Sequence, residues 1–139
     1  MANAIWLFLA LPVWFCSALK DPFGAGLLSE IPLIGILSLV AGVIGGLVQR
    51  RFPLLLFLLP IVQSECYVAI AGMLRGQVRG GASIAPLCIF LGLQACMIGL
   101  LIYRSKGARL TATLLALFCL SYALFASVVA GMAFANDWL

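Results

Sequence analysis

Histidine is absent from the sequence, and charged residues are scarce. Lysine, arginine, aspartate and glutamate together make up 9% of the 139 residues, whereas a typical soluble domain has about 25%. Without histidine, bis-histidine haem binding, the usual zinc sites and histidine-based acid–base catalysis are excluded. The five cysteines lie in apolar stretches and form no Cys-x-x-Cys pair. We therefore expect them to be small apolar packing residues and expect no cofactor or metal.

Hydrophobic residues make up 65% of the chain and gather in five stretches, residues 4–19, 31–48, 53–74, 83–103 and 110–134. None of these stretches contains lysine or arginine, and roughly 20 apolar residues are enough for a helix to cross a bilayer. Strands of a membrane barrel would alternate apolar and polar residues, which these stretches do not. The sequence therefore predicts an all-α membrane protein with five transmembrane helices, or four if the short first stretch does not span.

The first stretch resembles a signal peptide in length only, because no lysine or arginine precedes Lys20. We interpret it as a membrane segment of a single transmembrane domain, residues 1–139. With five spans, the second and fourth loops would share a side with the amino terminus. These two loops contain five of the eight basic residues, Arg50, Arg51, Arg104, Lys106 and Arg109.

Cytoplasmic loops of membrane proteins are enriched in lysine and arginine. The charge distribution therefore predicts a cytoplasmic amino terminus and an external carboxyl terminus, in the inner (cytoplasmic) membrane of a bacterium. The positive net charge of +4 is then explained by the orientation of the chain in the membrane. We therefore expect the chain to interact with a lipid bilayer and not with nucleic acid.

A weak internal similarity suggests a tandem repeat. A shift of 54 positions places Pro32 on Pro86 and aligns several apolar residues and glycines that follow. The two units would be helical hairpins, residues 31–74 and 85–133, preceded by helix 4–19. Because the connecting loops are short, we expect consecutive helices to be antiparallel neighbours. Chance similarity between apolar helices is the alternative explanation.

Glu65 is the only acidic residue inside an apolar stretch. A charge at bilayer depth costs about 2.5–3.5 kcal/mol or more, so such residues face the protein interior and often serve function. We expect Pro60 to kink this helix and to free the carbonyl of Leu56. From depth alone, the expected partners of Glu65 are Gln94 or Ser121. The candidate intramembrane polar site comprises Glu65, Gln63, Ser64, Gln94, Ser121 and Tyr122.

Small residues four positions apart mark two helix-packing faces. One is Ser38, Gly42 and Gly46 in the second stretch, and the other is Ala126 and Ala130 in the fifth. Such faces let helix backbones approach closely. The spacing does not distinguish packing within the chain from packing against a partner subunit or a second copy.

Three functions are compatible with these features. The short loops and small-residue faces favour a non-catalytic structural or assembly subunit of a membrane complex or homo-oligomer. Glu65 alternatively indicates a small proton- or cation-coupled transporter or channel. Its carboxyl would then couple transport to the ion or select which ion passes. An enzyme is the least favoured class, because no nucleophile–base pair can be named. The surroundings of Glu65 distinguish the first two, since a wet cavity favours transport and a dry interhelical hydrogen bond favours assembly.

Overall fold

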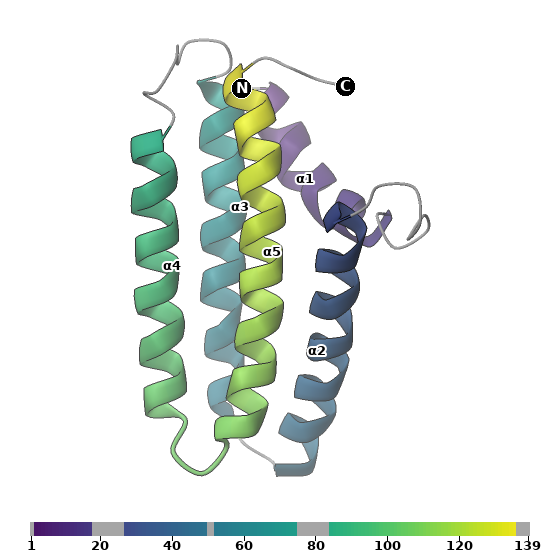
Figure 1. The fold of residues 1–139 in the computed structure, drawn as a ribbon, viewed down its shortest axis with the longest axis vertical. Helices are drawn as coiled ribbons and strands as arrows, with labels where there is room; N and C mark the ends of the chain where they lie inside the picture. The colour runs from purple at the N-terminus through teal and green to yellow at the C-terminus, as the bar shows by residue number, and fades with distance from the viewer. Residues whose placement is uncertain (1, 18–26, 50–51, 75–83, 136–139) are drawn as a thin grey trace.

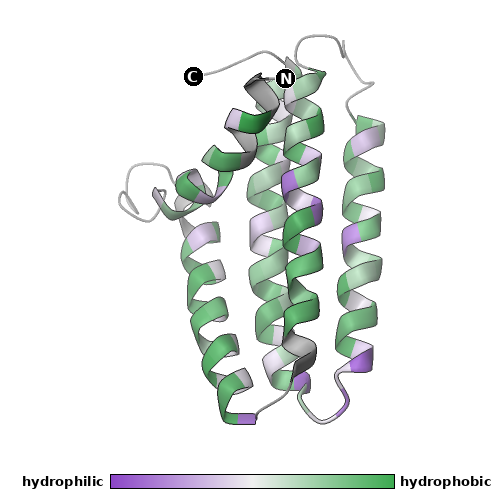
Figure 2. Cartoon of the chain, turned by 180° about the vertical axis from the view of Figure 1, so that it is seen from behind, coloured by the Kyte–Doolittle hydropathy of each residue, from purple (hydrophilic) through white to green (hydrophobic). Residues whose placement is uncertain are grey.

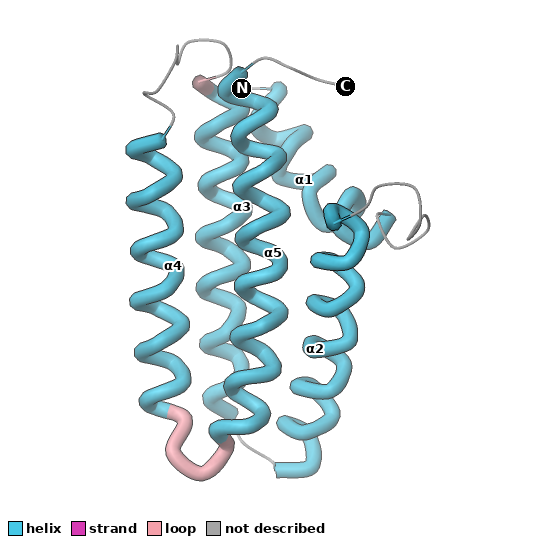
Figure 3. The backbone as a smooth tube through the Cα atoms, in the orientation of Figure 1, coloured by secondary structure: helices cyan, strands magenta, loops and turns pink. Residues whose placement is uncertain are grey.

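The computed structural model describes residues 2–17, 27–49, 52–74 and 84–135. Regular structure in these ranges is entirely helical (Figures 1 and 3). A short turn, residues 105–108, joins the last two helices, and Gly107 there has a φ of 91°, which glycine adopts without steric cost. The elements are α1 (Ala2–Ser17), α2 (Leu27–Gln49), the 3-10 helix η1 (Phe52–Phe57), α3 (Leu58–Met73), α4 (Ile84–Arg104) and α5 (Arg109–Ala135).

Four of the described helical segments are long and apolar enough to cross a membrane, Ile31–Gln49, Leu55–Met73, Ile84–Arg104 and Arg109–Phe134. Figure 2 shows the hydrophobic colour along these helices, interrupted by a few hydrophilic positions near mid-height. The predicted class, an all-α membrane protein with several spans, is confirmed. The exception is α1, whose 16 residues extend about 24 Å at 1.5 Å per residue, less than the roughly 30 Å of a hydrocarbon core.

The first two helices run in the same direction along the bundle. In Figures 1 and 2, α1 descends obliquely from the end at which α5 finishes, and α2 begins part-way along the bundle and continues to the opposite end. The start of α1 and the end of α5 therefore lie at the same end. Five successive crossings would have placed them at opposite ends, so this arrangement corresponds to the four-span alternative.

Helix α5 forms the centre of the bundle. It contacts α1, α2, α3 and α4, and its most extensive contacts are with α2 and α3. The expectation that short loops make consecutive helices antiparallel neighbours is wrong for α1 and α2, which run in the same direction. It is also wrong for α2 and α3, because α2 packs chiefly against α5 while α3 packs against α5 and α1. The tandem hairpin repeat stays a prediction.

The glycine face of α2 is what allows its close approach to α5. A Cβ atom at Gly42 would lie 2.8 Å from the side chain of Leu115, and one at Gly45 would lie 2.9 Å from Thr111 Oγ1. Ser38 and Gly46 on the same face are buried. These small residues are therefore used for packing within the chain.

The second small-residue face is also internal. Ala126 and Ala130 of α5 are completely buried in the core cluster that α5 shares with its neighbours. By contrast, Gly131 is exposed, and a Cβ atom there would meet nothing within 4 Å. Gly131 therefore takes no part in this close packing.

Pro60 lies near the point where a 3-10 helix passes into an α-helix, and not inside one continuous α-helix as expected. The six-residue 3-10 helix η1 precedes α3, and Pro60 is the third residue of α3, where its missing N–H has no helical partner to lose. The carbonyl that acquires side-chain partners is that of Pro60 itself. It accepts hydrogen bonds from Ser64 Oγ at 3.0 Å and from Gln94 Nε2 at 3.2 Å.

The α2–α5 contact predicts different effects for two glycine substitutions. Gly42→Ala should lower the free energy of unfolding by about 1–3 kcal/mol, because the new methyl group overpacks the contact with Leu115. Gly92→Ala on α4 is the matched control, since a Cβ atom there has open space, and alanine should stabilise the helix by up to about 1 kcal/mol. Unfolding in detergent micelles, followed by circular dichroism, measures both; equal stability of the two variants would contradict the packing.

The arrangement of the ends predicts a topology. The turn between α4 and α5 contains Lys106 and lies between Arg104 and Arg109, so the preference of basic residues for the cytoplasm places this end of the bundle inside. The four-span arrangement therefore predicts two external ends, whereas five spans predict a cytoplasmic amino terminus. Reporter fusions at Ala2 and Leu139 should report the same side, opposite to a reporter inserted at Lys106. Reporters on opposite sides would restore the five-span topology.

Candidate intramembrane polar site

Glu65 is buried between α3 and α5. Its side chain is 6% exposed, and its Oε1 accepts a hydrogen bond from the hydroxyl of Tyr122, which is itself 4% exposed. Both residues lie well inside membrane-spanning segments. The bond gives the carboxyl a partner at a depth where lipid offers none, as hydrocarbon burial of polar groups requires.

The partner of Glu65 is therefore Tyr122, and the expectation of Gln94 or Ser121 is wrong. Ser121 Oγ donates to the carbonyl of Leu117 within its own helix at 2.9 Å, which is a common way for helical serine to satisfy its hydroxyl. Gln94 Nε2 donates instead to the carbonyl of Pro60. Matching depth was an insufficient guide because it carries no information about which way each helix faces.

A second polar contact joins α3 to α4. Gln94 Nε2 donates to the carbonyl of Pro60 at 3.2 Å, and Gln63 Nε2 donates to the carbonyl of Phe90 at 3.5 Å. Ser64 bonds back to Pro60 within α3. The six residues of the predicted polar layer thus divide into an α3–α5 pair, an α3–α4 pair of glutamines and two serines that satisfy their own helices.

Glu65 and Tyr122 line a cavity of about 220 Å³ between four helices. The remaining lining is apolar or weakly polar, with Phe15 and Cys16 from α1, Ile36 from α2, Ile61 from α3 and Phe118 from α5 among its members. This volume is below the roughly 300–1,000 Å³ of pockets for drug-sized ligands. The surface that the cavity presents is apolar, since the unpartnered oxygen of Glu65 is itself buried.

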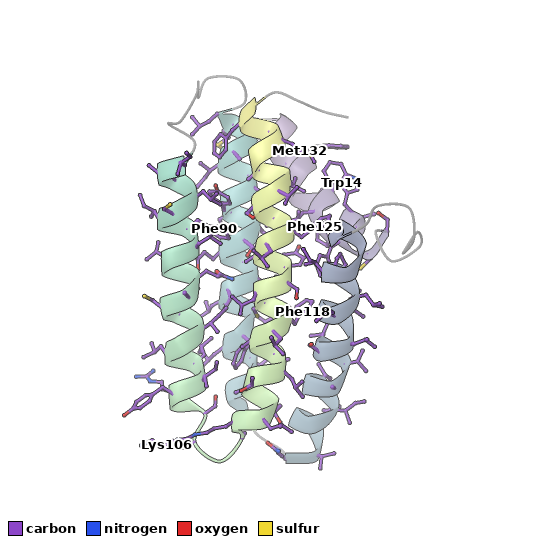
Figure 4. All side chains as sticks on the ribbon, viewed as in Figure 1. Trp14, Phe90, Lys106, Phe118, Phe125 and Met132 are labelled. Carbon is purple, nitrogen blue, oxygen red and sulfur yellow. The ribbon has the colours of Figure 1, made fainter. Side chains whose placement is uncertain are left out.

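Aromatic rings form one wall of this cavity. The Phe15 ring centroid lies 6.0 Å from that of Phe118 and 5.0 Å from that of Tyr122. Figure 4 shows Phe118 and Phe125 on the side of α5 nearer α1 and α2. Sequence analysis missed Phe15 and Phe118 as site residues. The spacing of Phe118 and Tyr122, four residues apart, is a one-face helical signal that could have identified the α5 part of the wall.

The second oxygen of Glu65, Oε2, is buried and has no hydrogen-bond partner among the described residues. A buried acceptor without a donor is unfavourable by about 1–3 kcal/mol, and more when it is charged. The described residues contain no group of three or more histidine, cysteine, aspartate or glutamate side chains that could hold a metal ion. A proton on this carboxyl would remove the charge that makes such burial most unfavourable.

Comparison of the chain with models of known protein families, with curated proteins and with solved structures finds no match. Helix length and composition define it as a multi-pass α-helical membrane protein. Any finer assignment depends on the polar site itself.

The Tyr122–Glu65 contact predicts a specific loss of stability. Tyr122→Phe retains the ring but removes the only donor to Glu65 Oε1 among the described residues, so the free energy of unfolding should fall by about 1–3 kcal/mol. Tyr103→Phe is the matched control, because Tyr103 is 67% exposed, and its effect should stay within about 0.5 kcal/mol. Detergent-micelle unfolding compares the two; an unchanged Tyr122→Phe protein would mean that the hydrogen bond contributes nothing.

Proposed function

We propose that this membrane protein binds a proton or another cation at Glu65 and acts as a small proton- or cation-coupled transporter or channel. The observation that carries the proposal is the position of Glu65. One carboxyl oxygen is held by Tyr122, and the other is without a partner among the described residues, in a side chain that lines a cavity inside the membrane span. A carboxyl fixed in this way is positioned to exchange a proton or a cation.

The positions of the end of α1 and the start of α2 support this proposal. The described part of α1 ends part-way along the bundle, and α2 begins part-way along it (Figure 1). Phe15 and Cys16, near the end of α1, line the cavity together with Ile36 of α2. In many transporters, helices that are interrupted near the middle of the membrane form the binding site. The cavity of Glu65 occupies the corresponding position here.

A structural or assembly subunit is the second candidate. The hydrogen bond between Glu65 and Tyr122 joins α3 to α5, and the two glutamines join α3 to α4. Such contacts stabilise membrane helix bundles without any transport role. In this case the partner would be another membrane subunit or a second copy of the chain. The oxygen of Glu65 that has no partner among the described residues is the feature that this candidate leaves unexplained, and it is why we place transport first.

Replacement of Glu65 distinguishes the candidates. Glu65→Gln keeps the shape and can still accept from Tyr122, so the protein should fold, but it cannot titrate. In proteoliposomes with an imposed pH gradient and membrane potential, the wild-type protein should dissipate the gradient faster than protein-free vesicles do. The rate of the variant should be at least about tenfold lower, as expected when the titrating group is removed.

Glu30→Gln is the matched control, because it removes the other glutamate of the chain and should leave the rate unchanged. A Glu65→Gln rate equal to that of the wild type would contradict the proposed function. So would a wild-type rate no higher than that of empty vesicles. Either result would favour the assembly subunit, for which Glu65→Leu should still weaken folding because Tyr122 loses its acceptor.

A further inference from the structure

One face of α4 is exposed along the helix. The opposite face is buried through Phe90, Gln94 and Ile98, and α4 packs chiefly against α5 and α3. On the exposed face, a Cβ atom added at Gly92 or at Gly99 would meet nothing within 4 Å. Because α4 is long and apolar enough to cross a membrane, either lipid or another membrane helix covers this face.

The exposed face of α4 leads to an aromatic residue and a cation. Successive intervals of four, three and four residues place on one side of the helix the exposed residues Gly92, Cys96, Gly99 and Tyr103. Tyr103 is 67% exposed, and Lys106 Nζ lies 5.6 Å from the centroid of its ring. Figure 4 shows Lys106 at the end of the bundle where α4 turns into α5. The face with open space beside its glycines therefore ends at a positive charge.

Three exposed basic residues form a cluster at this turn, Arg104, Lys106 and Arg109. The sequence has no acidic residue between Glu65 and Asp137, so no counter-charge lies close to the cluster along the chain. Arg109 is the first residue of α5, and the first turn of that helix contains no acidic residue. The positive end of the helix dipole favours an anion at such a position and disfavours a cation. The basic cluster is therefore suited to an anion from outside the chain.

We propose that this end of α4 binds an anionic phospholipid, with the headgroup phosphate at the basic cluster and one acyl chain along the two glycines. Arginine and lysine donate charge-assisted hydrogen bonds to phosphate oxygens, and tyrosine is enriched at the level of the headgroups. Gly99 and Gly92 lie roughly 6 and 17 Å from Tyr103 along the helix, at about 1.5 Å per residue. One leaflet contributes roughly 15 Å of hydrocarbon, so the glycines are within reach of an acyl chain. The proposal does not depend on transport at Glu65.

A second copy of the chain fits this face less well. In a dimer whose axis lies along the membrane normal, the same face of each α4 would meet its counterpart. Tyr103 lies on this face with Lys106 over its ring, so two basic clusters would be brought together at the end of the interface. Like charges at short range repel each other, whereas an anionic headgroup is attracted. The charge of the cluster therefore favours a lipid as the occupant.

The test uses native mass spectrometry of the full chain released from detergent micelles, which counts bound lipids. Phosphatidylglycerol is the probe, phosphatidylcholine with the same acyl chains is the zwitterionic control, and glycerol 3-phosphate supplies the phosphate without chains. We expect saturable binding of phosphatidylglycerol, at least about fivefold tighter than that of either control. Equal binding of phosphatidylcholine would show that charge plays no part, and equal binding of glycerol 3-phosphate would show a site for soluble anions. Either result would overturn the proposal.

Charge substitutions separate a headgroup site from an effect of net charge. Arg104→Gln and Lys106→Gln should each weaken phosphatidylglycerol binding about fivefold, the contribution expected of one basic residue beside an anionic membrane surface. Arg79→Gln is the matched control, because it removes the same charge from the segment between α3 and α4, and it should leave binding unchanged. Equal weakening by all three substitutions, or unchanged binding in all three, would overturn the headgroup site.

A glycine substitution tests the acyl-chain contact. Gly99→Leu would occupy the open space on α4 and should weaken phosphatidylglycerol binding by about fourfold, the value of one buried methylene group. Gly131→Leu is the matched control, because a Cβ atom at Gly131 of α5 also meets nothing within 4 Å, and binding should stay unchanged. Equal binding by both variants would overturn the acyl-chain contact. The same spectra report oligomers, and a dimer that Gly99→Leu abolishes would make a second copy the occupant and overturn the lipid proposal.

Discussion

The hydrogen bond from Tyr122 to Glu65 joins α3 to α5 at a depth where lipid cannot supply a partner for either group. Inside a bilayer, each polar side chain must find its partner within the protein. This requirement sets how α3 is rotated, because Glu65 must face α5 while Gln63 reaches the carbonyl of Phe90 on α4. The polar residues of α3 therefore determine which of its sides each neighbouring helix occupies, and apolar packing fills the remaining contacts.

The position of the cavity follows from how helices pack around α5. The glycine face of α2 allows close contact with α5 at Leu115 and Thr111. A Cβ atom at Gly35 would lie 3.0 Å from the Phe15 ring, so the end of α1 lies against α2 and α5 at the level of Ser121. The aromatic wall and the carboxyl thus meet where α1, α2, α3 and α5 converge, which gives the proposed cation site both its charge and its apolar surroundings.

The sequence predicted the helical membrane class and four of the spans because long apolar runs without basic residues have few other stable forms. It also identified Glu65 and Tyr122, since polar residues in such runs are conspicuous. It did not predict which of them pair, because helix rotation depends on packing across the bundle. It missed Phe15, because a phenylalanine in an apolar stretch carries no local sign of a site. Composition also could not predict that α1 and α2 run in the same direction. It gives the number of apolar residues in a stretch but not the depth in the membrane at which a helix ends.

The central claim is that one oxygen of Glu65 is held by Tyr122 while the other is buried without a hydrogen-bond partner among the described residues. Infrared spectroscopy of the protein in bilayers, with carbon-13 in the side-chain carboxyl of glutamate, tests it directly. The chain has two glutamates, so Glu30→Gln leaves Glu65 as the single labelled carboxyl. The account predicts that its C=O band shifts when Tyr122→Phe removes the donor, and that the band converts to a carboxylate band as the surrounding solution is made alkaline. A band insensitive to both changes would show a carboxyl sealed from the cavity and unconnected to Tyr122, and would contradict the account.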